Sequence, residues 1–477
     1  MAKDLKNEIK EITKVKAPIV EALKTAYENP TYQFHIPGHT KGKAIFKDFR
    51  KLIGDKALNI DTTDEFDNLG TLHPATGPIK EAQELAAQAF GAKKTFFLLN
   101  GSTAGNLALA MALTKKGQKI IVNRNCHRSI LTGLMISGAE PIWICPNRIE
   151  DWSVWGNVDA AKVEELLERN PDVSMVWITN PTYEGVVSDI KSISTVCKKY
   201  NVPLLVDEAH GCLWNFNKHL PETALKLGAD AVVHSLHKTG GSMSQSSMLH
   251  IAKDSTIDCD AVEKALKLLH TTSPSLMLLA SLDAARANLQ SKAGEKLLDR
   301  AVKNAKYLRT RLDAIPNLHQ LKGDFGYKTD VTKVFIKIDG LSGKRLESIL
   351  EIDFGIEVES ASDIGVLILC NIGNKRSDFK YLADSLEKIA ATNYQDIYYL
   401  ENRKHMPMLE PQIKMSLRDA FYAEKEVVNK SDAIGRISAE VIAECPPGIA
   451  ILLPGELITE EHLPYLNDYE TLEVVKY

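Results

Sequence analysis

Residues 230–250 read DAVVHSLHKTGGSMSQSSMLH. The apolar run Ala231–Val233 ends in a polar segment with two adjacent glycines, and a second apolar run opens at Met248. Short apolar runs bounded by glycine and hydroxyl-bearing residues are typical of strands. The pattern therefore predicts a strand, a polar turn that carries Lys238, and a second strand.

The neighbours of Lys238 are unusual for a lysine that only contacts solvent. Ser235, His237 and the pair Gly240-Gly241 lie beside it in the sequence. A lysine amine condenses with a carbonyl when its pKa is lowered and its position is fixed, while hydroxyls, imidazoles and glycine N–H groups suit a phosphate. Together these residues indicate a Schiff-base lysine for pyridoxal phosphate, with the phosphate held alongside. Taken by itself, Lys238 also fits an ordinary surface lysine in a loop.

Helical stretches and apolar runs alternate along residues 78–250. The helical stretches are expected near 78–91, 104–116, 128–138, 159–169, 189–200 and 219–228. The seven apolar runs are 95–99, 119–123, 141–145, 174–179, 202–207, 230–234 and 247–251. This alternation predicts an α/β fold with a mostly parallel, seven-stranded sheet covered by helices on both faces. In such sheets ligands bind at the carboxyl ends of the strands.

Three further polar features follow predicted strands. The GSTAG loop at 101–105 opens a helix and offers N–H groups and hydroxyls to an anion, although such loops often act only as helix caps. Asp207 ends an apolar run and can pair with the ring nitrogen of the cofactor, keeping it protonated, or can serve as a helix cap or salt-bridge partner. His127 can lie against an aromatic ring or deliver protons near neutral pH, or can be a structural histidine.

The sequence as a whole predicts that the chain is divided into four structural segments. Residues 1–50 form an N-terminal helical segment, 51–325 a large domain that binds the cofactor, 326–395 a smaller α/β domain, and 396–477 a C-terminal extension that completes or covers a site. A long helical region is expected at 261–300, with an interruption at 271–274.

Composition favours a cytoplasmic enzyme over a nucleic-acid-binding or membrane protein. The formal net charge of the 477 residues is −4, without a basic field for nucleic acid. The seven cysteines are scattered, which favours a reducing compartment, and the N-terminus shows no apolar secretory signal. The uncharged run Thr95–Thr114 is about long enough to span a membrane, but its internal polar residues favour a strand, a polar loop and a buried helix.

Two other kinds of site would use some of the same residues. The DEAH sequence at 207–210 matches the acidic box of helicase-type NTPases, but the sequence has no G-x-x-x-x-G-K-[ST] phosphate loop. A hydrolytic zinc or manganese site built from Asp207, His210, His234 and His237 would leave Lys238 and the GSTAG loop without a role. We therefore expect no metal.

An ordered series of motifs resembles the Orn/Lys/Arg decarboxylases over about residues 33–460. The motifs are FHIPGHTKG (34–42), AQELAAQAFGA (82–92), NGST (100–103), RNCHRSI (124–130), NPTYEGVVSDI (180–190), VDEAHG (206–211), SLHKTGGSMSQSSMLH (235–250), TTSPS (271–275) with LLASLD (278–283), and CPPGIAILLPGE (445–456). The resemblance implies the aspartate-aminotransferase fold (fold type I) and pyridoxal phosphate as cofactor. The chain looks most like the compact bacterial arginine decarboxylases without an N-terminal wing domain. Arginine to agmatine plus CO2, in polyamine biosynthesis, is the implied reaction. A lysine or ornithine decarboxylase, or an aminotransferase of the same fold, is the alternative.

The resemblance also implies residue roles. Lys238 would bind the cofactor covalently, Asp207 would pair with its ring nitrogen and His127 would stack on its ring. The remaining roles concern the phosphate (Ser102, Thr103, Ser235, His237), the opposite ring face and its surroundings (Ala209, His210), the basic amino-acid substrate (Glu359), and a segment contributed across the interface of a homo-oligomer that is at least a dimer (Thr271, Thr272, Ser273).

Overall fold

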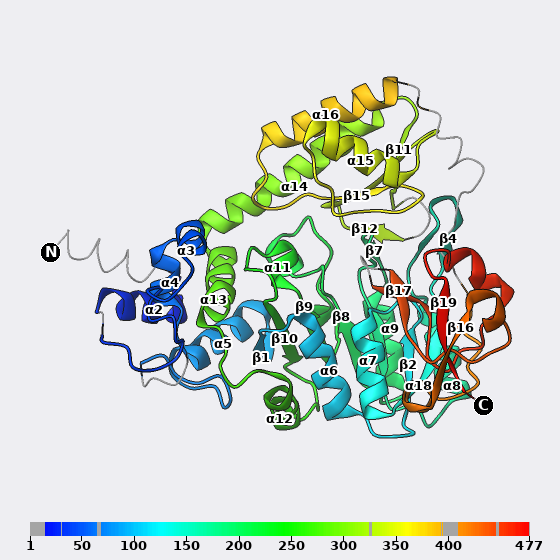
Figure 1. The fold of residues 1–477 in the computed structure, drawn as a ribbon, viewed down its shortest axis with the longest axis horizontal. Helices are drawn as coiled ribbons and strands as arrows, with labels where there is room; N and C mark the ends of the chain where they lie inside the picture. The colour runs from blue at the N-terminus through cyan, green and yellow to red at the C-terminus, as the bar shows by residue number, and fades with distance from the viewer. Residues whose placement is uncertain are drawn as a thin grey trace.

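The seven apolar runs form one seven-stranded sheet in the computed structural model, which describes residues 15–29, 31–63, 68–323, 327–392, 394, 409–444 and 448–476 (Figure 1). The strand order is β1 (Ala92–Leu98), β10 (Ser247–Ala252), β9 (Ala231–His234), β8 (Leu204–Asp207), β6 (Val176–Thr179), β2 (Lys119–Asn123) and β3 (Glu140–Ile144). Neighbours from β9 to β3 are parallel, and β10 runs antiparallel to both β9 and β1. The predicted mostly parallel sheet is confirmed.

Both faces of this sheet are buried, because alternate side chains of each strand point to opposite faces. In β2, Ile120 and Val122 pack in the same core as α6 (Gly101–Leu113), α7 (Arg128–Ser137) and α12 (Cys259–Leu269). Ile121, between them, packs in the core formed with α8 (Ala160–Arg169) and α9 (Ile190–Lys199). This arrangement explains why the strand sequences are continuous apolar runs rather than alternating ones.

The predicted helices of residues 78–250 are present, with two differences from the sequence expectation. The helices α5 (Gly77–Phe90) and α6 to α9 match the expected ranges closely, but the last one, α10, is a single turn at Ala224–Leu227. In the second difference, the expected irregular turn after β9 contains a one-turn helix, α11 (Leu236–Thr239), so Lys238 lies on a helix. Backbone hydrogen bonds within this turn fix the position of the lysine more closely than a loop would.

The helical region after β10 has three helices. They are α12, α13 (Leu276–Gln290) and α14 (Lys292–Asp313), and the break between the first two falls at the predicted residues 271–274. At the N-terminus, α2 (Pro18–Glu28) packs against α13 and α5, followed by α3 (Lys47–Ile53) and α4 (Asp55–Ile60). Residues 1–14 of the predicted N-terminal helical segment lie outside the described residues.

A second, smaller sheet lies above the seven-stranded sheet in the view of Figure 1. Its strand order is β11 (Leu318–Gln320), β13 (Lys333–Ile338), β15 (Val366–Leu369) and β14 (Ser360–Ala361). The helices α15 (Gly343–Phe354), α16 (Arg376–Ala391) and the second half of α14 pack with it in one core. The predicted division at residues 325 and 326 stays a prediction.

Two contacts connect later parts of the chain to the loops around the seven-stranded sheet. The hairpin of β17 (Ile442–Glu444) and β18 (Ile449–Leu452) packs against the large domain, where the buried Arg124 guanidinium donates to the carbonyls of Ala450 and Ile451. In addition, β12 (Lys328–Thr329) pairs with β7 (Val186–Val187), which joins the start of the small unit to the loop after β6. Across the described residues, no helix has both the length and the apolarity needed to cross a membrane.

Candidate active site

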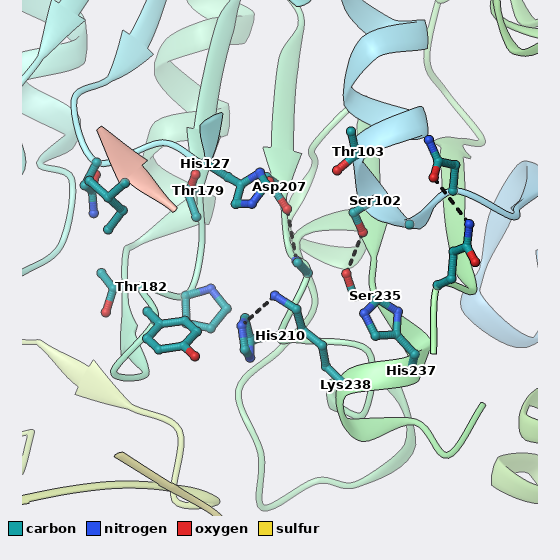
Figure 2. A pocket seen from close by; sticks show the side chains of 18 residues that line it. Ser102, Thr103, His127, Thr179, Thr182, Asp207, His210, Ser235, His237 and Lys238 are labelled. Atoms are coloured by element: carbon teal, nitrogen blue, oxygen red, sulfur yellow. Dashed lines mark hydrogen bonds between the residues drawn. The ribbon is translucent and has the colours of Figure 1, made fainter. Parts of the chain in front are cut away.

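A cavity of about 270 Å³ lies at the carboxyl ends of the parallel strands (Figure 2). Its wall contains nine of the predicted site residues. The full lining is Asn100, Gly101, Ser102, Thr103, Asn125, His127, Thr179, Pro181, Thr182, Tyr183, Asp207, Ala209, His210, Ser235, His237, Lys238, Gln245 and Ile449. Residues separated by up to 349 positions therefore meet at the place where α/β sheets bind their ligands.

Lys238 extends from α11 into this cavity. Its Nζ lies 2.9 Å from Nε2 of His210, as Figure 2 shows. Burial lowers the pKa of Lys238, while the carboxylates of Asp207 and Glu359 act in the opposite direction. A lowered pKa increases the fraction of neutral amine, which is the form that attacks a carbonyl carbon.

Asp207 ends β8 and is almost fully buried beside the cavity. Its Oδ2 accepts a hydrogen bond from Nδ2 of Asn106 at 3.0 Å, and its Oδ1 accepts one from the N–H of Ala209 at 3.2 Å. Neither partner is a cation, so the carboxylate charge remains available to a positively charged ligand atom.

His127 caps the N-terminus of α7 with its side chain. Its Nδ1 accepts from the N–H of Ser129 at 3.1 Å and lies 2.7 Å from the Ser129 hydroxyl. Burial lowers the pKa of His127, and Asp207 opposes this effect. A neutral imidazole whose Nδ1 accepts must carry its hydrogen on Nε2, so His127 offers a ring face and one donor to the cavity.

Hydroxyls and a helix N-terminus gather at the other side of the cavity. Oγ of Ser102 lies 2.7 Å from Oγ of Ser235, and Ser102 and Thr103 belong to the first turn of α6. N–H groups of a first helical turn lack partners within the helix and attract anions. His237 lies beside them, and its Nδ1 donates to the carbonyl of Ser246 at 2.8 Å, which leaves Nε2 for a ligand.

The groups that line the cavity fit pyridoxal phosphate. The amine, the buried carboxylate and the hydroxyl-rich helix start match its aldehyde, its ring nitrogen and its phosphate, respectively. The buried Oγ1 of Thr179 also lines the cavity and has no hydrogen-bond partner among the described residues, so it is available to a ligand. Within the described part of the chain, no three His, Cys, Asp or Glu side chains are grouped to hold a metal ion.

Comparison with known proteins assigns the chain to a family. The description "Orn/Lys/Arg decarboxylase, major domain" matches residues 17–332, and "Orn/Lys/Arg decarboxylase, C-terminal domain" matches residues 399–474. The chain belongs to the Orn/Lys/Arg decarboxylase family. The predicted family and the decarboxylase assignment are therefore confirmed.

Several relatives within the Orn/Lys/Arg decarboxylases cover most of the chain. An arginine decarboxylase of Bacillus subtilis is 38% identical over 94% of this chain and 92% of its own length. One of Halalkalibacterium halodurans is 39% identical over 93% and 91%. The inducible lysine decarboxylase of Escherichia coli is 25% identical, and this chain covers 80% of it. The structure of lysine decarboxylase A from Pseudomonas aeruginosa matches at 22% identity with a TM-score of 0.86, over 100% of this chain and 82% of its own. The predicted fold and the likeness to compact arginine decarboxylases are thus confirmed.

Two predicted residue sets do not line the cavity of this Orn/Lys/Arg decarboxylase. Glu359 lies one side chain further out, where its Oε1 accepts a hydrogen bond of 2.7 Å from the hydroxyl of the cavity residue Tyr183. Thr271, Thr272 and Ser273 are exposed and do not line the cavity. Their predicted roles, like those of the cavity residues, stay proposals.

Several cavity residues are absent from the sequence prediction. Tyr183 follows a strand within the NPTYEG motif, so its position at a strand end was a usable signal. Ile449 comes from the C-terminal hairpin, where it forms a bridge to His127. His234, considered as a metal ligand, instead lies fully buried with its Nε2 2.7 Å from Glu208 and does not line the cavity.

Proposed function

We propose that this protein is a pyridoxal-phosphate-dependent arginine decarboxylase that forms agmatine and CO2 as a step of polyamine synthesis. One observation carries the proposal. Lys238, Asp207 and a hydroxyl-lined helix start surround a single cavity in a chain that is 38% identical to an arginine decarboxylase over nearly its whole length.

The first task of the chain is to hold the cofactor. When bound, pyridoxal phosphate supplies an electron sink for the pair released from the bond to the α-carboxylate. Lys238 is the proposed covalent attachment point, and Asp207 holds a proton on the ring nitrogen. The phosphate ligands are Ser102, Thr103, Ser235 and His237, the last of which can donate from Nε2 only when its ring is protonated.

The second task is to orient the substrate and supply one proton. His127 and Ala209 would contact opposite faces of the cofactor ring, with His210 next to it, and all three line the cavity. A proton must reach Cα after CO2 leaves, and two donors are suitably placed: Nζ of Lys238 and Nε2 of His127. A cavity of about 270 Å³ brings these groups together around the place proposed for the reacting atoms.

The third task is to bind the distal cation of the substrate, because a charge taken out of water needs an opposite charge or donors and acceptors. Glu359 is the proposed acceptor. It already acts on the cavity electrostatically, since it favours the charged forms of both Lys238 and His237. Its hydrogen bond to Tyr183 orients the carboxylate toward the cavity wall.

Glu359→Gln is therefore expected to reduce kcat/KM for arginine by about 10- to 100-fold, because a charge-assisted hydrogen bond becomes a neutral one. The matched control is Glu357→Gln, which changes an exposed carboxylate two residues earlier. Steady-state rates of agmatine formation provide the measurement. Equal kcat/KM values for Glu359→Gln and the control would contradict the assignment.

A substrate panel tests the reaction itself. The purified protein is loaded with pyridoxal phosphate and incubated separately with arginine, lysine and ornithine, and CO2 and the amine product are measured. We expect the highest kcat/KM with arginine. A preference for lysine or ornithine would show that the enzyme is a lysine or ornithine decarboxylase. A keto acid formed without CO2 would identify an aminotransferase.

We also propose that the active form contains at least two copies of the chain and is cytoplasmic. The exposure of residues 271–273 supports an interface there. Large apolar side chains of the N-terminal segment are also exposed: Tyr32 (95%), Phe34 (97%), Phe46 (76%) and Leu52 (82%). The six described cysteines are free thiols, which suits a reducing compartment. A monomeric sedimentation coefficient for the active protein, or activity recovered in a secreted fraction, would contradict these two points.

A further inference from the structure

A second lysine lies directly behind the cavity. Lys333 opens β13 and is only 2% exposed, so it does not line the cavity. Its Nζ lies 2.8 Å from Nδ1 of His210 and donates to the carbonyl of Tyr183, also at 2.8 Å. His210 therefore bridges two lysines, with Lys238 on Nε2 and Lys333 on Nδ1.

The packing around Lys333 fixes it in this position. Gly185 has a φ of +96°, and a Cβ at that position would lie 2.9 Å from Cβ and Cδ of Lys333. The N–H of Asp330 donates to the carbonyl of Gly185 at 2.9 Å, next to the pairing of β7 with β12. Only glycine allows the loop after β6 to approach the lysine stem this closely.

The bridge limits how many protons the three groups hold. A neutral imidazole donates through one nitrogen and accepts through the other. One of the two lysines can therefore donate to His210 as an ammonium, but the other must accept from it as a neutral amine. The alternative, a charged imidazole between two lysines, is disfavoured because burial and the two lysines hold the pKa of His210 well below its ordinary value.

We propose that Lys333 is the proton acceptor that keeps the amine of Lys238 neutral, with the imidazole of His210 passing the proton between them. The Lys238 ammonium gives one proton to Nε2 of His210, and the hydrogen on Nδ1 moves to Nζ of Lys333. Only N–H bonds change, and the imidazole ends as its other neutral tautomer. Lys333 acts through His210 and is thus a positioning residue for Lys238.

The surrounding charges permit this exchange. Burial is the largest cause that lowers the pKa of each lysine, and it brings the pKa of Lys333 to about 7. The groups that act on the three members are Asp330, Glu184 and Glu359 on Lys333, Asp207, Glu359 and Cys212 on Lys238, and His237 and His127 on His210. The two hydrogen bonds of the Lys333 Nζ within the described residues go to a carbonyl and an imidazole, so its charge is not fixed by a bonded carboxylate.

The reactivity of Lys238 toward trace acetic anhydride tests the inference in the full-length, cofactor-free chain. Mass spectrometry quantifies acetylation of Lys238 across a pH range against the exposed Lys328 as internal reference. We expect Lys333→Met to slow the acetylation of Lys238 about tenfold at pH 7, because a neighbouring positive charge and the proton acceptor are both lost. Lys333→Arg keeps a charged donor on Nδ1, which holds the hydrogen of His210 on Nε2, and it should restore the reactivity. Lys191→Met, at an exposed lysine of α9, should leave the reactivity unchanged.

A substitution of His210 separates the effect of the imidazole bridge from direct repulsion between the two lysines. In a His210→Gln background, Lys333→Met should change the acetylation of Lys238 far less than in the wild-type background. Equal acetylation of Lys238 in wild type and Lys333→Met, or the same tenfold effect without His210, would overturn the inference. If Lys333→Met does not fold, His210→Gln alone should still slow acetylation, and a wild-type pH curve for Lys238 that coincides with that of Lys328 would overturn the inference.

This inference rests on the proposed function of Lys238 as the reactive amine, but different experimental results would contradict the inference and the function. If the protein decarboxylates arginine but Lys333→Met leaves the acetylation of Lys238 unchanged, the proposed function holds and the proton transfer through His210 is contradicted. If the acetylation of Lys238 depends on Lys333 through His210 but no CO2 is released from any basic amino acid, the proton transfer holds and the proposed function is contradicted.

Discussion

Lys238→Ala is expected to lower the rate of decarboxylation by roughly three orders of magnitude or more, the largest effect of any single change at this site. The methyl group of alanine cannot bind a carbonyl carbon covalently and cannot carry a proton to Cα. It also leaves the Nε2 atom of His210 without its partner at 2.9 Å. The visible absorbance of the bound cofactor in the Schiff-base region should disappear with the amine.

Two measurements follow the effect. Absorbance spectra of the loaded protein report covalent attachment, and CO2 release from arginine reports turnover. Lys191→Ala is the control, because Lys191 is exposed on α9 and does not line the cavity. Wild-type turnover in the Lys238→Ala protein with every basic amino acid would refute the role of this lysine.

Asp207→Asn is expected to have the second largest effect, which is a loss of about 100- to 1000-fold in kcat while the cofactor remains bound. A neutral amide does not stabilise a proton on the ring nitrogen, so the ring accepts electrons less well. The substitution is nearly isosteric, but the carboxylate accepts from both Asn106 and Ala209. An amide has a single oxygen, so one of these two bonds is lost, at a cost of about 1 kcal/mol in stability.

Cofactor content and turnover must be measured on the same Asp207→Asn sample, since loss of the cofactor would imitate loss of catalysis. Asp189→Asn is the matched control, because Asp189 is an exposed carboxylate that caps α9 at a distance from the cavity lining. An Asp207→Asn protein with full cofactor content and an unchanged kcat would show that the carboxylate does not tune the ring.

The strands and most helices could be predicted from the sequence because each is encoded locally. An apolar run of five or six residues between two amphipathic helices leaves little choice other than a buried parallel strand. Asp207 and the GSTAG loop could be predicted for the same reason, since the end of a strand and the start of a helix are both visible in the sequence. The helix α11 was missed because one turn of helix has no periodicity to detect.

The residues that sequence reasoning missed depend on tertiary contacts. Lys333 is the second residue of the run TKVFIKI (332–338), where a lysine next to the start of a strand reads as solvent-exposed. In the structure it is buried, with its Nζ against His210, 123 positions away. Ile449 begins β18 and reaches the cavity because Arg124 donates to the carbonyls of Ala450 and Ile451 in the same strand. Glu359 was predicted from family resemblance alone, and its position behind Tyr183 could not be inferred from spacing.

The central claim is that one amine, that of Lys238, binds pyridoxal phosphate covalently. Borohydride reduction of the loaded protein, followed by proteolysis and mass spectrometry, tests it most directly. The account predicts a phosphopyridoxyl group on the peptide that contains Lys238 and on no other lysine in stoichiometric amount. A stoichiometric label on a different lysine, or a protein that binds the cofactor without any reducible bond, would contradict it.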